Sequence, residues 1–195
     1  MNDNKTTIEF VNHASALISF GKIGILSDPW YSKSVFHSGW RLLYENENNY
    51  INQVLDRTSH IYISHEHPDH FNPNYLLNDE IKKKIIQKGI IFLFQKTKDQ
   101  RVINFLKNKN FKVLELDQKK NKIGNFIEVE IIKHDFYDSS ISIKTPDTKI
   151  LNLNDCPLRN ITEIKKFKKK FGTFDILLTQ FSYAAWKGGK KGKIF

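Results

Sequence analysis

The sequence predicts an α/β fold, and three observations along its 195 residues carry that prediction. Short apolar segments open the chain in close succession, as in an antiparallel meander. The middle then alternates, with strands predicted over 90–94 and 112–116 on either side of a helix over 99–109, whose Val102 and Leu106 share one apolar stripe. The composition, 39% hydrophobic with 15 phenylalanines, is sufficient for a buried core.

The elements before this alternation follow from local pattern. The predicted strands cover 7–11, 16–20, 23–27 and 60–64, and the predicted helices cover 50–58 and 72–89. Gly21 and Lys22 turn the chain between two of the strands, and Gly89 ends the second helix. The stretch 31–49 has no periodicity and mixes aromatic with polar residues, which predicts a long loop able to roof a site.

After the alternation the pattern returns mainly to strands. The predicted strands cover 126–135, 140–145, 149–155 and 175–181. A helix is predicted over 161–172, with its lysines in water and an inner stripe of Ile161, Ile164, Phe167 and Phe171. No internal repeat or linker is visible, so residues 1–195 are expected to form a single domain.

Charge and cysteine content limit the classes of partner. The net charge of +10 would suit nucleic acid, but the lysines are dispersed along the chain, which favours solvated helix faces over a binding surface. No apolar run of about 18 residues and no signal-like start are present, so no membrane association is expected. The single cysteine, Cys156, fits a reducing compartment. We therefore expect a cytoplasmic protein.

The segment "SHEHPDH", residues 64–70, follows the strand predicted over 60–64. Residues two apart in an extended segment point the same way, so His65 and His67 can present two imidazoles to one ion. Pro68 stiffens the turn and sets Asp69 and His70 on another heading, toward a second ion. Imidazoles and carboxylates suit zinc, and also iron or manganese. An accidental histidine run in a polar loop is the alternative, and Glu66 between the ligands is expected to point away.

The string formed by His65, His67, Asp69 and His70 resembles the signature of the metallo-β-lactamase superfamily. That resemblance covers roughly residues 7 to 182 and implies an αββα sandwich with two divalent metal ions, most simply zinc.

The same resemblance gives roles to three further residues. It implies Asp28 as the aspartate that supports the histidine loop, His134 as the third ligand of the first metal, and Asp155 as the carboxylate that bridges both metals.

Within that superfamily, the strings "IYISHEHPDHFNP" and "DILLTQFSYAAW" look most like the metal-binding domain of CMP-N-acetylneuraminate hydroxylase-type proteins. The broader group includes ascorbate-phosphate lactonase-like hydrolases. These likenesses imply a small-molecule substrate, sugar or sugar-nucleotide derived. No Rieske-type pairing of cysteine and histidine is seen in the chain, so oxygenase chemistry has no such redox centre here.

One departure from the superfamily pattern concerns its last histidine, which normally serves the second metal after a late strand. No histidine follows His134 in this sequence. Either part of the C-terminal half is missing or the second metal site is weak, and we favour truncation because such folds usually carry a second half of similar weight.

Three functions are compatible with these residues. The leading one is hydrolysis of a small-molecule ester, lactone, amide or phosphoester by a metal-bound hydroxide, with Asp69 orienting the water or accepting its proton. The others are a nuclease acting on RNA or DNA, and a truncated metal-binding remnant without activity. The sequence leaves the oligomeric state open.

Several other residues keep two interpretations each. His13 either lines the site or is a structural histidine. His37 and Trp40 could both contact substrate, and Trp40 is alternatively an anchor of the core. Cys156 is expected to be a buried filler beside Asp155. Tyr183 and Trp186 either face the cleft or pack against a cap.

Overall fold

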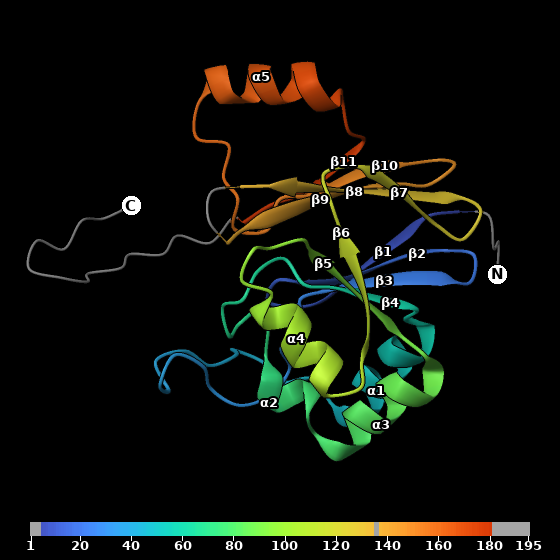
Figure 1. The fold of residues 1–195 in the computed structure, drawn as a ribbon, viewed down its shortest axis with the longest axis vertical. Coiled ribbons are helices and arrows are strands. Elements are labelled where there is room, and N and C mark those ends of the chain that lie inside the picture. Colours follow the sequence, from blue (N-terminus) through green and yellow to red (C-terminus); the bar gives the residue numbers. More distant parts are fainter. Residues whose placement is uncertain (1–4, 135–136, 181–195) are drawn as a thin grey trace, which may run out of the picture.

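The protein is a sandwich of two β-sheets with helices on its outer faces, as the sequence predicts (Figure 1). The computed structural model describes residues 5–134 and 137–180. Helices α1 to α4 cover the six-stranded sheet on one side, and α5 lies over the five-stranded sheet on the other (Figure 1). The layer order is therefore helix, sheet, sheet, helix.

The six-stranded sheet has the strand order β1-β2-β3-β4-β5-β6. Its strands are β1 Thr7–Asn12, β2 Ser15–Phe20, β3 Ile23–Ser27, β4 His60–Tyr62, β5 Ile91–Gln95 and β6 Lys112–Leu116. The first three strands pair antiparallel, as expected for the opening meander, and β3 to β6 pair parallel. The parallel strands all end at the same edge, where the loops after β3 and β4 meet.

The five-stranded sheet has the order β11-β10-β9-β8-β7. Its strands are β7 Lys120–Ile123, β8 Ile127–Lys133, β9 Ser139–Lys144, β10 Lys149–Asn152 and β11 Ile176–Leu178. Strand β7 was not predicted, because "KNKI" is mostly polar and only Ile123 is buried. The strand predicted to continue to residue 181 is described only to Leu178, and Phe181 lies outside the described residues.

The helices are α1 Asn48–Arg57, α2 Pro73–Leu76, α3 Asp79–Lys88, α4 Arg101–Asn108 and α5 Ile161–Phe171. The single helix predicted over 72–89 is two helices. The Asn72 side chain caps α2 by accepting a hydrogen bond from the Tyr75 amide at 2.9 Å, and Asn78 caps α3 in the same way. Two capping asparagines six residues apart therefore divide the segment.

Two apolar layers hold the sandwich together. Between the sheets, side chains such as Tyr62 and Leu93 pack against Val129 and Ile141, all fully buried. The second layer joins the six-stranded sheet to α1, α3 and α4. Burial of each such side chain stabilises the fold by roughly 1.5–3 kcal/mol.

Helix α5 packs less deeply against its sheet than the other helices do. None of its residues is fully buried, and Phe167 and Phe171 make its contact with Leu151 of β10 and with Leu153 just after it. Ile161 and Ile164 were expected on the inner stripe but are 64% and 42% exposed. The predicted stripe is therefore correct only in its C-terminal half.

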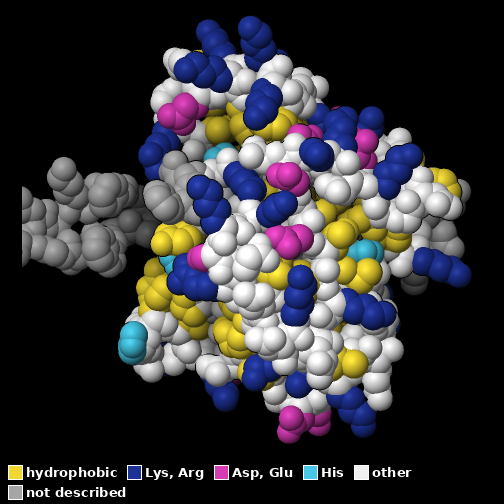
Figure 2. Space-filling view, viewed as in Figure 1, with side chains coloured by type: hydrophobic (Ala, Val, Ile, Leu, Met, Phe, Trp, Pro, Cys, Tyr) yellow, Lys and Arg dark blue, Asp and Glu magenta, His cyan; other side chains and the backbone are white. Residues whose placement is uncertain are grey.

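The surface shows no single basic face in the view of Figure 2, where Lys and Arg side chains are interspersed with Asp and Glu. No helix in the described part of the chain is long and apolar enough to cross a bilayer.

Candidate metal centre

The predicted metal-binding residues lie at one edge of the sandwich, where several chain segments end or turn. Asp28 follows β3, the histidine string follows β4, and Asp155 follows β10. The two-residue β1–β2 turn and the hairpin between β8 and β9 reach the same edge. The fold thus brings together side chains that are up to about 140 residues apart in the sequence.

Asp28 is the buried support of this edge, with 1% of its surface exposed. Its Oδ1 accepts a hydrogen bond from the Ser64 amide at 2.7 Å, and its Oδ2 accepts one from the Ser64 hydroxyl at 2.8 Å. Oδ2 also lies 3.0 Å from Nδ1 of His70. These contacts fix the start of the histidine string and leave Nε2 of His70 as the nitrogen that faces the cluster.

The electrostatic surroundings of His70 favour positive charge on its ring. Burial alone would lower the pKa of His70, but the charge of Asp28 and hydrogen bonds to Asp155, Asp28 and Asp69 raise it well above its usual value. These contacts favour the protonated form of the metal-free ring.

His65 and His67 turn toward each other near the start of the string. Nε2 of His65 lies 2.9 Å from Nδ1 of His67, while Nδ1 of His65 lies 2.9 Å from the Ser64 hydroxyl. Burial, followed by the nearby charge of His70, lowers the pKa of His65. His65 is consequently neutral at pH 7, the form in which imidazole binds a metal.

Asp155 lies between the two groups of imidazoles. Its Oδ2 is 3.4 Å from Nε2 of His70 and 4.0 Å from Nε2 of His65. Burial opposes ionisation of Asp155, but the hydrogen bond and charge of His70 outweigh it and lower the pKa of the carboxyl. The preceding Asn154 has a φ of +48°, a left-handed conformation that Asn tolerates, and it forms part of the turn that precedes this carboxylate.

Asp69 lies on the other side of His70. Its Oδ2 is 3.4 Å from Nε2 of His70 and 3.1 Å from Nε2 of His13. Burial raises its pKa, yet these hydrogen bonds dominate and hold it well below the usual range. Its other oxygen, Oδ1, is buried and has no hydrogen-bond partner among the residues that the structure describes. An unpartnered buried carboxylate oxygen is costly, and a cation or a water satisfies it.

These side chains form two groups with the donor set of a metal site. In one group, ligand atoms of His65, His70 and Asp155 all lie within 4.8 Å of one another. In the other, the same limit holds for His13, Asp69 and His70. Ligands that share one ion at about 2.1 Å lie at most about 4.2 Å apart, so small movements suffice to close either group on a metal.

The structure brings neither the exposed His67 nor His134 into either group. Nε2 of His134 lies 3.0 Å from the hydroxyl of Ser140, and the His134 amide donates to the Asp138 carbonyl at 2.9 Å, closing the β8–β9 hairpin. The third-ligand role implied for His134 by the resemblance stays a prediction. From the same hairpin, Asp138 extends its carboxylate to within 3.9 Å of Nε2 of His65.

Sequence reasoning missed Asp138 and left His13 open. The signal for Asp138 is its position just before β9, where it faces His134 across a short hairpin. The signal for His13 is its place in the two-residue turn between β1 and β2, directly beside the start of the loop that carries Asp28. Glu66 points away from the cluster, as expected, and pairs with Arg101 at 2.7 Å.

The loop predicted to roof the site places aromatic rings beside it. Val35 and Trp40 pair across its tip, and Phe36, His37 and Ser38 between them all have left-handed φ values. The Phe36 ring lies 6.1 Å from that of His67, and the Trp40 ring lies 6.4 Å from that of His13. Trp40 is 48% exposed, so it is not the core anchor that the sequence left as an alternative.

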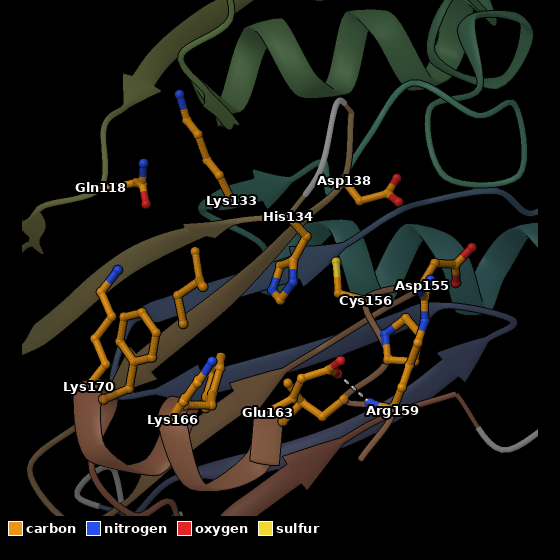
Figure 3. Close-up of a pocket in the computed structure, with 15 residues that line it drawn as sticks. Gln118, Lys133, His134, Asp138, Asp155, Cys156, Arg159, Glu163, Lys166 and Lys170 are labelled. Atoms are coloured by element: carbon orange, nitrogen blue, oxygen red, sulfur yellow. Dashed lines mark hydrogen bonds between the residues drawn. The ribbon is translucent and has the colours of Figure 1, made fainter. Parts of the chain in front are cut away.

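A cavity of about 430 Å³ extends from the metal residues toward α5. His134, Asp138, Asp155 and the buried Cys156 line one part of it. Opposite them lie the charged side chains of Arg159, Glu163, Lys166 and Lys170 (Figure 3). Tyr183 and Trp186, which the sequence left undecided between cleft and cap, lie outside the described residues.

No family model matches the chain. It is 23% identical over 201 residues to a Mycolicibacterium smegmatis protein named "Putative Rieske 2Fe-2S iron-sulfur protein", which covers 90% of this chain and 34% of that protein. It is 25% identical over 160 residues to the cytidine monophosphate-N-acetylneuraminic acid hydroxylase of Xenopus laevis, covering 78% of this chain and 26% of the hydroxylase. The chain thus spans about a third or less of these relatives.

Solved structures are similar over most of the chain. CmlA, a diiron β-hydroxylase from Streptomyces venezuelae, superposes with a TM-score of 0.64 at 20% identity, over 89% of this chain and 34% of CmlA. A "possible metal-dependent hydrolase" from Veillonella parvula superposes with a TM-score of 0.66 at 14% identity, over 96% of this chain and 74% of that one. The chain has the metallo-β-lactamase fold that the sequence predicts.

Proposed function

We propose that the chain is a metal-dependent hydrolase of a small molecule, with ester, lactone, amide and phosphoester bonds as the candidate targets. The observation that carries the proposal is the convergence of His65, His70 and Asp155 with Asp69, whose Oδ1 is buried without a partner in the described part of the chain. His65 and His67 would hold one divalent ion, Asp69 and His70 the other, and Asp155 lies between them. Bound ions of this kind polarise a substrate oxygen and lower the pKa of water to near 7.

The side chains of the site supply orientation and proton handling. Asp28 holds His70 through Nδ1, which keeps Nε2 directed at the cluster. Oδ1 of Asp69 is positioned to orient a water or to accept its proton, because the lowered pKa keeps the carboxylate ionised and the oxygen has no competing donor among the described residues.

The expected substrate is acidic, for example a sugar-nucleotide or another phosphorylated or carboxylated sugar derivative. The cavity beside the metal residues supports this proposal, because Arg159, Lys166 and Lys170 line its wall near α5 against one carboxylate, that of Glu163. Cationic walls raise the local concentration of anionic substrates.

The test of the activity is hydrolysis of a panel of esters, sugar lactones, amides and phosphoesters by protein loaded with zinc, manganese or iron(II). Asp69→Asn should lower kcat by about 10²–10⁴-fold, and removal of metal by a chelator should abolish turnover reversibly. Asp56→Asn is the matched control, because Asp56 is an exposed carboxylate of α1 that pairs with Lys84 at 2.8 Å. No metal-dependent turnover on any substrate class would count against the proposal.

The acidic-substrate proposal has its own test on α5. Lys166→Ala should raise KM for a phosphorylated substrate and leave KM for its neutral analogue unchanged. Lys168→Ala is the matched control, since it is exposed on the same helix but does not line the cavity. Equal effects of both variants on both substrates would refute a role for the cavity in charge recognition.

A second candidate function is oxidation at an iron pair. Asp138 favours it, because a carboxylate beside His65 gives the oxygen-rich donor set that suits iron and manganese. The relatives named as hydroxylases and the diiron CmlA support the same proposal. Oxygen uptake with iron, an added reductant and substrate, together with a product 16 mass units heavier, would favour oxidation over hydrolysis.

A further inference from the structure

We infer that His13, in the turn between β1 and β2, is a ligand of the second metal ion. The inference rests on the proposed metal centre and adds a donor that the sequence pattern of the superfamily does not supply. Asp69, His70 and the shared Asp155 are the donors that the sequence pattern assigns to the second ion among the described residues. The fold brings an imidazole to that ion from the opposite end of the chain.

The first support is distance. Nε2 of His13 lies 3.1 Å from Oδ2 of Asp69, and the ligand atoms of His13, Asp69 and His70 are mutually within 4.8 Å. A separation of 3.1 Å between nitrogen and oxygen suits two ligands of one ion as well as it suits a hydrogen bond. The neighbouring Oδ1 of Asp69 is buried and unpartnered among the described residues, so the hydrogen bond alone does not satisfy this carboxylate.

The second support is the packing of the ring. The His13 ring meets that of the buried Trp30 edge-on at 5.1 Å between centroids, and the rings of His70 and Trp40 lie at 5.9 and 6.4 Å. One third of the side chain stays exposed, which leaves an approach for an ion from solvent. These contacts place the imidazole beside His70 and Asp69, where a second ion would bind.

The third support is backbone conformation. His13 has a φ of +44°, a left-handed conformation that Gly or Asn adopts at lower cost in a two-residue hairpin turn. Asp28, which supports His70, and Asn154, which precedes Asp155, also have left-handed φ values. Residues in this uncommon conformation gather at functional sites. The backbone at His13 thus agrees with a role for its side chain beyond the turn.

The closing experiment measures metal binding and does not depend on turnover. The purified full chain is titrated with Co²⁺ in competition with a chromophoric chelator, which gives the number of ions and the dissociation constant of each. We expect two ions in the parent. His13→Ala should weaken the second ion by at least about 100-fold, more than the loss of a hydrogen-bonded partner usually costs, and should leave the first unchanged. His37→Ala, an exposed histidine of the aromatic loop, is the matched control.

His13→Asn separates a ligand from a positioning residue. Asn tolerates the left-handed φ and can still donate a hydrogen bond to Asp69, but its amide is a poor ligand for a transition metal. Loss of the second ion in both His13 variants supports the inference. Retention of that ion in either His13→Asn or His13→Ala overturns it.

Spectroscopy of the Co²⁺ protein gives an independent readout. Each bound imidazole contributes one hyperfine-shifted exchangeable N–H signal, and His13→Ala should remove one such signal from the parent spectrum. A parent that binds one ion refutes the His13 inference and leaves a mononuclear hydrolase in place. A parent that binds none refutes both proposals, whereas two ions with an unchanged signal count in His13→Ala refute the inference alone.

Discussion

The two halves of the candidate centre differ in how deeply their side chains are buried. On the Asp69 and His70 side, both side chains are at most 4% exposed, and Asp28 beneath them is also buried. On the His65 and His67 side, His65 is buried, but His67 is exposed and the facing Asp138 carboxylate is 34% exposed, while Asp155 faces both sides. The more deeply buried half is thus the one proposed for the second ion.

This comparison alters the expectation drawn from the sequence. The absence of a late histidine left truncation, the favoured explanation, or a weak second site, yet the second-ion side has the denser hydrogen-bond support and an additional imidazole in reach. The first-ion side depends on a hairpin that carries His134 and Asp138 at its mouth. The number of ligands in the sequence does not show how well the fold buries each ligand and holds it by hydrogen bonds.

The largest expected effect comes from removing the support of the second-ion side. Asp28→Ala leaves the Ser64 amide, the Ser64 hydroxyl and the charged His70 without their partner in a buried site. Breaking a buried charge pair in this way costs about 3–5 kcal/mol in the free energy of unfolding, measured by urea denaturation of the metal-free protein.

The cost of Asp28→Ala should depend on pH in a defined direction. Because the pKa of His70 is raised in the folded state, the stabilisation by its pairing is fully present below about pH 6.5 and is lost as pH rises through the folded pKa. The destabilisation should therefore be larger at pH 6 than at high pH. Asp99→Ala, at an exposed surface pair, is the control and should leave stability unchanged at both. A loss that is the same at every pH would show that the charge of His70 is not involved.

The next effect concerns the first-ion side and tests whether Asp138 or His134 of the β8–β9 hairpin contributes more to binding of the first ion. Asp138→Ala should weaken the first ion by about 10–100-fold, because its carboxylate faces Nε2 of His65 at 3.9 Å. His134→Ala should weaken it less, since His134 already bonds to Ser140. Equilibrium titration with Zn²⁺ measures both, and the reverse order would restore the ligand role that the resemblance implies for His134.

Much of the fold was predictable because its signals are local. The opening meander, the strand–helix–strand alternation and the helix over 161–172 follow from periodicity and glycine placement, and the structure contains each of them. The errors lie at two places, where a capping residue was overlooked and where a strand has a mostly polar sequence. The helix predicted over 72–89 is divided by the cap at Asn78, and β7 is recruited by pairing with β8 in spite of its polar sequence.

The candidate site was predictable only in part, for a similar reason. His65, His67, Asp69 and His70 form one contiguous string, so their proximity follows from the sequence itself. Asp138 and His13 approach that string only through tertiary structure, and no spacing rule relates residue 13 to residue 69. Their roles depend on how two hairpins meet at one edge of the sandwich, which a single sequence does not encode in any short pattern.

A smaller effect concerns the protons that each ion releases when it binds. His70 is protonated in the metal-free protein because burial is outweighed by Asp28 and the neighbouring carboxylates, so binding of the second ion must displace that proton. We expect release of about one proton at pH 7, and an affinity for the second ion that rises by up to about tenfold per pH unit. Calorimetry in buffers of different ionisation enthalpy measures the release. The first ion, bound by the neutral His65, should release fewer protons.

The smallest expected effect concerns the aromatic loop that lies beside both halves. Trp40 is half exposed, and its ring centroid lies 5.2 Å from that of Phe36 and 6.4 Å from that of His13. It can therefore contact substrate at the site without binding metal. Trp40→Ala should raise KM by about fivefold, equivalent to about 1 kcal/mol of lost ring contact, with kcat and metal content unchanged. Leu43→Ala, at a fully exposed position of the same loop, should change neither constant. A fall in metal content in Trp40→Ala would instead make Trp40 part of the seat that holds His13 against the second ion.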